Sequence, residues 1–246
     1  RCQTPMRFIF VDRLVAVEPA RSIETLKNVS ATEDVFTDHF PGHPILPGAL
    51  IVEAFGQAAQ LLIGMTHDFA TVGRLTRRKG QDMIIKAFPA VLRSIPNARY
   101  VIIGDGPDRV YFQNLIQDLK MQKYIEIRSK VTDAELGGYY TTASLFAMPT
   151  RAIGPDIEGF GIVFLEAAFF SLPIIAGRSG GEREALGGDP NALFVDGENL
   201  EEIAECITHV LADSELAGFL GAHAKKHLDT LPDWNTQAKR LAQILS

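Results

Sequence analysis

Two separate groups of residues in this 246-residue sequence could do chemistry, and the first lies near the amino terminus. His39 and Glu53 are separated by a loop rich in proline and glycine that ends at Gly48. Imidazole titrates near neutrality and a carboxyl group on an apolar helix becomes a stronger base, so the two could form an acid and base pair. The Gly48 amide stands where the helix is expected to begin and could donate to a developing oxyanion. Two alternatives stay open: an ordinary loop histidine with a buried helix carboxylate, and a metal site of His39 and His43.

The second group combines two cations with two carboxylates. Arg74 and Lys79 lie between a short predicted strand and a predicted helix. There they suit a diphosphate, because arginine can grip two oxygens and lysine adds a point charge; a solvated basic loop is the alternative. Glu158 and Glu166 flank the start of another predicted helix, and carboxylates accept several hydrogen bonds from sugar hydroxyls. The glycines of residues 159–161 let backbone amides approach an anion closely, although Glu166 could be only a carboxylate favoured by the helix dipole.

Composition and charge exclude several classes of function. The formal net charge of −6 gives no basic surface for nucleic acid. Cys2 and Cys206 stand far apart, so a reducing compartment is expected and the protein is predicted to be cytoplasmic. Nothing at the start resembles a signal peptide. The most apolar run, 49–65, contains Glu53 and two glutamines, which predicts a core helix rather than a membrane span.

The elements that must position these residues follow two patterns. Residues 6–29 alternate and are rich in β-branched and aromatic side chains, which predicts two antiparallel strands with a turn near Pro19. From about residue 70 strands alternate with helices, which is typical of a parallel sheet with helices on both faces. In such sheets ligands bind beyond the carboxyl ends of the strands. We therefore expect two domains, 1–66 and 70–246.

The second domain is expected to contain six strands and six helices. The strands are predicted at 71–73, 99–104, 124–128, 145–148, 173–176 and 193–195, and the helices at 81–93, 109–121, 133–141, 162–170, 200–211 and 215–228.

Four motifs of the amino-terminal part are Phe10–Arg13, Lys27–Ser30, His39–Leu50 and Glu53–Gln57. With them, residues 6–64 resemble the 3-hydroxyacyl-(acyl carrier protein) dehydratases of fatty acid synthesis. That resemblance implies the hot-dog fold, a curved antiparallel sheet wrapped around one apolar helix. It also implies that His39 and Glu53 act from different subunits of a dimer, while the Gly48 amide polarises the thioester. Asp38 departs from the family, which usually has glycine there.

The resemblance ends just after the helix, so the long strands that wrap the helix in that family are absent. We do not expect an apolar helix without its cover to be stable by itself. We expect this segment to dock on the neighbouring domain, to associate with another chain as an oligomer, or to be poorly packed. Dehydratase activity, with acyl carrier protein as partner, is expected only in assembly with complete subunits.

The motifs of the second part are Val72–Leu75 with Lys79–Gly80, Val101–Pro107, the E-x7-E motif from Glu158 to Glu166, and Gly180–Gly181. From about Val72 to Trp234 the chain resembles the donor-binding half of the GT-B glycosyltransferases. The similarity is to the retaining family that includes bacterial mannosyltransferases and sucrose synthases. Residues 156–163 look most like mannosyltransferases acting on lipid acceptors, which favours GDP-mannose as donor and peripheral contact with a membrane.

This second resemblance implies a role for each matching residue. Arg74 and Lys79 would neutralise the donor diphosphate, Glu166 would hold the ribose hydroxyls, and Glu158 would contact the transferred sugar. Gly159, Phe160 and Gly161 would offer main-chain donors. Neither a metal nor a cofactor is implied. The amino-terminal GT-B domain, which holds the acceptor and usually a catalytic histidine, has no counterpart in the sequence.

The sequence thus predicts an α/β protein: a Rossmann-like parallel sheet with helices on both faces, preceded by a partial hot-dog α+β segment. The predicted function is binding of a nucleotide-diphosphate sugar for retaining glycosyl transfer. The alternatives are a non-catalytic sugar-nucleotide-binding module or fusion remnant, and the dehydratase in assembly.

Overall fold

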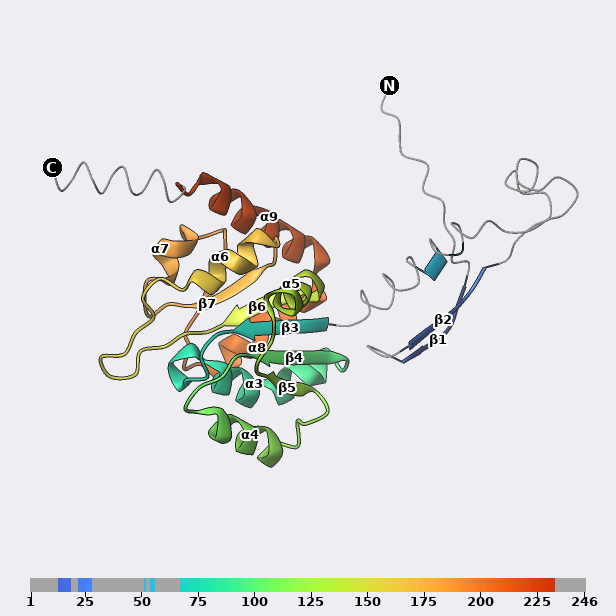
Figure 1. The fold of residues 1–246 in the computed structure, drawn as a ribbon, viewed down its shortest axis with the longest axis horizontal. Helices are drawn as coiled ribbons and strands as arrows, with labels where there is room; N and C mark the ends of the chain where they lie inside the picture. The colour runs from blue at the N-terminus through green and yellow to red at the C-terminus, as the bar shows by residue number, and fades with distance from the viewer. Residues whose placement is uncertain (1–12, 19–21, 28–50, 52–53, 56–66, 233–246) are drawn as a thin grey trace, which may run out of the picture. The chain divides into compact units, whose positions relative to one another are not determined.

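The structure is a computed structural model, and it describes residues 13–18, 22–27, 51, 54–55 and 67–232. The chain divides into two compact units, Arg1–Thr66 and His67–Ser246. Each unit is described by itself (Figure 1).

The first unit contains an antiparallel strand pair. Strand β1 (Arg13–Glu18) pairs with β2 (Ser22–Leu26), with an irregularity in the register between Leu14 and Ala16. This confirms the two antiparallel strands predicted within residues 6–29, although the first begins at Arg13, and the apolar stretch 8–11 lies outside the described residues. In the predicted apolar helix, Ile51 and Phe55 are helical and 41% and 71% exposed, so these two side chains are not covered.

The second unit is built on one parallel sheet of six strands in the order β5-β4-β3-β6-β7-β8, which confirms the predicted fold class. The strands are β3 (His67–Val72), β4 (Ala98–Ile103), β5 (Ile125–Arg128), β6 (Leu145–Met148), β7 (Ile174–Gly177) and β8 (Leu193–Val195). Every residue of β6 and β7 is buried, as expected for central strands covered on both faces.

Strand β3 is longer than the sequence predicted. It begins at His67 and not at residue 71, because residues 67–70 pair with β4 and the Phe69 side chain is fully buried in the core. The Phe69 ring stacks on Tyr100 with 4.8 Å between ring centroids. Tertiary packing therefore extends the strand into the boundary between the two predicted domains.

Helices cover both faces of the sheet (Figure 1). They are α3 (Gln81–Ser94), α4 (Arg109–Asp118), α5 (Asp133–Thr142), α6 (Ile162–Phe169), α7 (Glu182–Leu186), α8 (Leu200–Ala212) and α9 (Ser214–Thr230). One apolar core lies against α3, α4 and α8, and a second lies against α5, α6 and α7 with part of α9. Side-chain caps from Thr132, Asn199 and Asp213 satisfy the first amides of α5, α8 and α9.

Strands β4 and β5 are added on one side of β3, whereas β6, β7 and β8 follow on its other side, so the order of connection changes between the neighbours β3 and β6. The loop after β3 leads through the 3-10 helix η1 (Arg77–Lys79) to α3 on one face, whereas the loop after β6 leads to α6 on the other. Such a point leaves a crevice beyond the carboxyl ends of the strands, where ligands bind in open α/β sheets. We call this place the switch point; both loops are part of the second predicted functional group.

Candidate functional site

Lys79 reaches the switch point because Gly80 turns the chain sharply. Gly80 ends η1 and precedes α3 with φ +80°, in the left-handed region that favours glycine. A Cβ atom there would lie 2.0 Å from the Pro149 carbonyl oxygen in the loop after β6. Only glycine allows the two loops to approach so closely, and this brings the Lys79 side chain against the β6 loop.

Glu158 receives two cations from the opposite loop. The Lys79 Nζ lies 2.5 Å from Glu158 Oε2, and the Arg78 Nη1 donates to the same oxygen at 2.8 Å. Arg78 also places its Nε 2.9 Å from Asp156 Oδ1. The Glu158 residue is 7% exposed, so little water reaches its carboxylate, whereas the Asp156 side chain is 64% exposed. The structure thus brings together Lys79 and Glu158, two residues that the sequence predicted for one site.

The charge of Glu158 depends on these partners. Burial alone would raise its pKa, but the hydrogen bonds and charges of Lys79 and Arg78 outweigh burial, and the pKa is lowered from its ordinary value. The carboxylate is therefore ionised near neutral pH and can accept hydrogen bonds. Of the alternatives for the basic segment, a solvated loop fits only Arg74 and Arg77, whose residues are exposed, whereas the Lys79 side chain is 12% exposed.

The backbone at the start of α6 is held by a second glycine loop. Gly161 precedes α6 with φ +78°. The Gly181 amide donates to the Glu158 carbonyl oxygen at 3.1 Å, and a Cβ on Gly181 would lie 1.7 Å from the Gly159 carbonyl oxygen. The loop after β7 therefore packs backbone to backbone against residues 158–159. Phe160 remains 43% exposed, at the helix N-terminus where amides can meet an anion.

Glu166 lies within α6 and has a different partner. Its Oε2 accepts a hydrogen bond from the Tyr140 hydroxyl of α5 at 2.7 Å. Burial, followed by the hydrogen bond to Glu166 and then the Glu166 charge, raises the Tyr140 pKa, so the tyrosine stays protonated and can donate. The carboxylate is half-buried and its orientation is fixed by Tyr140.

Arg74 begins the loop after β3, and among the described residues no carboxylate pairs with its side chain. Hydrogen bonds to the main chain set its position: the Gln81 side-chain amide donates to the Arg74 carbonyl oxygen, and the Leu75 backbone amide donates to the Asp105 carbonyl oxygen at 3.0 Å. The close approach of the loops after β3 and β4 also requires glycine at position 104, because a Cβ there would lie 2.1 Å from the Gly73 carbonyl oxygen. The exposed guanidinium is therefore available to a ligand at the ends of β3 and β4.

The residues of the first predicted group, His39, Gly48 and Glu53, lie outside the described residues, as does Asp38. Their proposed roles stay predictions.

A family model described as glycosyl transferases group 1 matches residues 57–227. The chain belongs to this family. Among curated relatives, a GDP-mannose-dependent alpha-(1-6)-phosphatidylinositol monomannoside mannosyltransferase from Mycobacterium tuberculosis is 33% identical over 232 residues, which are 94% of this chain and 57% of the relative. This glycosyl transferase chain therefore spans little more than half the length of that relative.

Two solved structures show that the fold is shared. An Anabaena protein in complex with UDP and glucose matches with a TM-score of 0.64 and 22% identity, over 77% of this glycosyl transferase and 51% of that chain. The C-terminal domain of a glycosyl transferase group 1 family protein from Francisella tularensis matches with a TM-score of 0.59 and 24% identity. It covers 67% of this chain and 85% of that chain.

The amino-terminal part of this chain has a second match. A family model described as a FabA-like domain matches residues 3–86, which supports the predicted dehydratase resemblance. The match extends beyond residue 64 and overlaps the glycosyl transferase match from residue 57 onward. The structure places residues 67–86 in β3, η1 and the first part of α3, within the parallel-sheet unit.

Three residues that contact the candidate site were not predicted from the sequence: Arg78, Asp156 and Tyr140. Arg78 directly precedes Lys79, so the adjacent cations were the signal that could have found it. Tyr140 lies on a different helix from Glu166, and no spacing rule joins them. Within the described residues, no group of acidic, histidine or cysteine side chains could hold a metal ion, and no helix is long and apolar enough to span a membrane.

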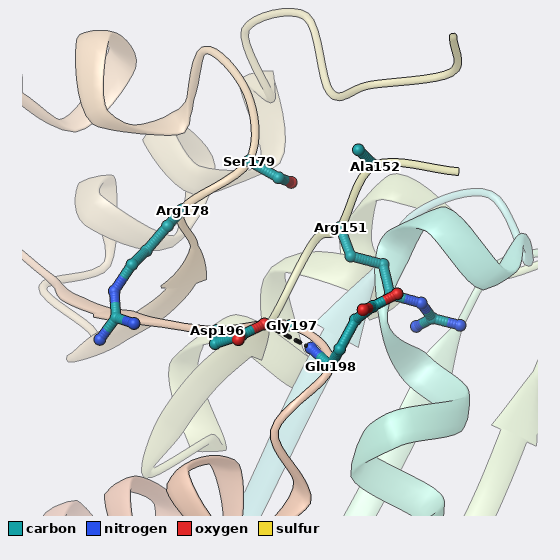
Figure 2. A pocket seen from close by; sticks show the side chains of 7 residues that line it. All are labelled: Arg151, Ala152, Arg178, Ser179, Asp196, Gly197 and Glu198. Atoms are coloured by element: carbon teal, nitrogen blue, oxygen red, sulfur yellow. Dashed lines mark hydrogen bonds between the residues drawn. The ribbon is translucent and has the colours of Figure 1, made fainter. Parts of the chain in front are cut away.

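A separate pocket of about 370 Å³ lies at the ends of β6, β7 and β8 in this glycosyl transferase (Figure 2). Its lining residues are Arg151, Ala152, Arg178, Ser179, Asp196, Gly197 and Glu198. Figure 2 shows the Arg151 and Arg178 side chains pointing in opposite directions. Arg151 donates twice to Asp82 at 2.9 Å, and Arg178 pairs with Glu202.

Proposed function

We propose that the second unit binds a nucleotide-diphosphate sugar at the switch point, as the donor site of a retaining hexosyl transferase. One observation carries this proposal: Lys79 and Glu158 meet where the loops after β3 and β6 diverge. A cation for the diphosphate and an ionised carboxylate for sugar hydroxyls thus stand side by side and mostly buried, where charged hydrogen bonds are strong.

Each residue of the second group then has a role. Arg74 and Lys79 neutralise the diphosphate, and Glu158 accepts hydrogen bonds from the transferred sugar. Glu166, oriented by Tyr140, accepts hydrogen bonds from the ribose hydroxyls. The amides of Gly159, Phe160 and Gly161 donate to the donor from the start of α6.

We extend the proposal to GDP-mannose as donor and a lipid as acceptor, with the protein working at a membrane surface from the cytoplasm. The mycobacterial relative supports this proposal, because it is a GDP-mannose-dependent phosphatidylinositol monomannoside mannosyltransferase. Because this chain spans 57% of that relative, transfer requires that the acceptor be positioned by a part that the alignment does not supply.

The deciding experiment is calorimetric titration with GDP, UDP, GDP-mannose and UDP-glucose. We expect micromolar binding to one base, and a loss of about tenfold in affinity in Glu166→Ala and in Arg74→Ala, the value of one charged hydrogen bond. Glu184→Ala is the matched control, since Glu184 is exposed on α7. A folded protein that binds none of the four ligands would refute the donor site. Binding without turnover on a lipid acceptor would indicate a non-catalytic module.

A second function is favoured by the FabA-like match to residues 3–86. In this proposal the 1–66 domain, distinct from the 70–246 domain, completes a dehydratase site with His39, Glu53 and Gly48 when it assembles with complete subunits on acyl carrier protein substrates. The test is hydration of a crotonyl thioester by the chain alone and mixed with complete dehydratase subunits. Activity of the mixture that does not depend on His39 would refute it.

A further inference from the structure

Arg78 joins the two loops of the switch point more extensively than Lys79 does. Its Nη1 donates to Glu158 at 2.8 Å, its Nε lies 2.9 Å from Asp156, and its carbonyl oxygen accepts from the Arg151 amide at 2.9 Å. The Arg78 side chain is 17% exposed. Asp156 is itself held in a turn, because its backbone forms two hydrogen bonds with Ile153.

Both cations contact the same carboxylate oxygen. Lys79 Nζ and Arg78 Nη1 each approach Oε2 of Glu158. An ionised carboxylate can accept up to about four hydrogen bonds, so Glu158 can accept further hydrogen bonds from a ligand while it is held by these two cations.

Lys79 has two competing partners once a donor binds. In the structure its ammonium group is paired with Glu158, but the proposed function also requires it to neutralise a diphosphate. The diphosphate carries more charge than a carboxylate, and the four-carbon lysine stem lets the ammonium group move between them. If Lys79 were the only partner, Glu158 would lose its anchor at the moment when it must contact the sugar.

We infer that Arg78 is a positioning residue that holds Glu158 in place while Lys79 turns to the donor diphosphate. This inference rests on the proposed donor site. The guanidinium suits the task, because its Nη1 donates to Glu158 while its Nε lies at ion-pair distance from Asp156 without a hydrogen bond, whereas a lysine ammonium is a single point charge. Arg78 thus contributes to recognition of the sugar and not of the nucleotide.

The test compares a nucleoside diphosphate with its sugar conjugate. GDP with GDP-mannose and UDP with UDP-glucose are titrated into the protein, and the ratio of the two dissociation constants within each pair measures the contribution of the sugar. In Arg78→Met we expect the diphosphate affinity to stay within about twofold and the sugar contribution to fall about tenfold, the value of a charged hydrogen bond. Arg78→Lys should restore part of that contribution.

Two neighbours on η1 serve as controls. Arg77→Met removes an exposed cation that contacts Asp108 instead, and it should change neither affinity. Lys79→Met should weaken the diphosphate and the sugar conjugate together. Thermal unfolding of each variant shows that the fold is intact.

Each outcome is decisive. If Arg78→Met weakens the diphosphate and its conjugate by the same factor, Arg78 contacts phosphate directly and the inference is wrong. If the variant changes neither affinity, or if the wild-type protein gains nothing from the sugar, the inference also fails while the donor site stands. Absence of binding by the wild-type protein to all four ligands overturns the donor site itself.

Discussion

The switch point and the pocket beside β8 lie at the same edge of one sheet, yet their charges are used differently. At the switch point the exposed Arg74 side chain has no carboxylate partner among the described residues, and Lys79 and Arg78 converge on one oxygen of Glu158. In the pocket, Arg151 and Arg178 are already paired with Asp82 and Glu202, and they point in opposite directions. The pocket beside β8 therefore offers fewer unpaired cations to an anionic ligand than the switch point does.

The comparison shows that charged groups without partners, more than the shape of a pocket, indicate a binding site. A guanidinium that donates both hydrogen bonds of its fork to a buried carboxylate has little left for a phosphate. Strand order explains the contrast. Successive strands are added on one side of β3 and then, from β6 onward, on its other side, so the loops after β3 and β6 diverge and bring opposite charges together there.

The largest effect is expected from Lys79→Met. The substitution removes the proposed diphosphate partner and leaves a mostly buried Glu158 with one cation fewer, so donor affinity should fall by about 100-fold, the usual cost of truncating a buried charge pair. Calorimetry with the donor measures it. An unchanged affinity in a folded variant would show that Lys79 does not bind the donor, and the switch point would then have no advantage over the pocket beside β8.

Gly181→Ala tests the backbone contact that holds residues 158–159. An added Cβ would lie 1.7 Å from the Gly159 carbonyl oxygen, so the loop must shift, and we expect a loss of about 2 kcal/mol in the free energy of unfolding. Donor affinity should fall with it. The matched control is Gly138→Ala in α5, where a Cβ meets nothing within 4 Å and where alanine favours the helix. Equal stability of both variants in denaturant would contradict the close packing.

The pH dependence of stability tests the charge of Glu158. Its pKa in the folded protein is below the ordinary value of 4.5, so its stabilising contribution is complete above that value and is lost as the pH falls through the lowered pKa. Below pH 4.5 the wild-type protein should therefore lose stability more steeply than Glu158→Gln. Glu184→Gln should retain the wild-type slope. Parallel curves for the wild type and Glu158→Gln would show that the cations do not stabilise the carboxylate.

Arg178→Met should have the smallest effect. Arg178 is half exposed and paired with Glu202, and exposed pairs contribute about 0.5 kcal/mol to stability, so the change in unfolding free energy should be of that order. Donor affinity should not change. A loss of donor binding comparable to that of Lys79→Met would place the ligand in the pocket of Figure 2 instead.

Much of the second unit could be predicted from its sequence, because its signals are local. Buried runs such as β6 and β7, and the glycines near Lys79 and Glu158, identify strands and sharp turns without knowledge of the rest of the fold. The early start of β3 could not be predicted in this way, since Phe69 is buried by residues distant in sequence.

The contacts between residues of the candidate site could not be predicted from the sequence either. The role of Tyr140 depends on α5 lying beside α6, and that of Arg78 on the distance between two loops about 80 residues apart in sequence. The sequence identified which residues could do chemistry and left open which of them meet. For His39 and Glu53, the family match supports the resemblance, while their contacts lie outside the described residues.

The buried pair between Asp82 and Arg151 has a consequence for the thermodynamics of binding. Asp82 lies in the first turn of α3, just after η1, and Arg151 follows β6, so two hydrogen bonds of 2.9 Å tie the start of α3 to the loop after β6. Loops fastened at two places before a ligand arrives lose little freedom when it binds. The ordering cost is met during folding, so association should be fast, and its entropy should be less unfavourable than that of a site that closes around its ligand.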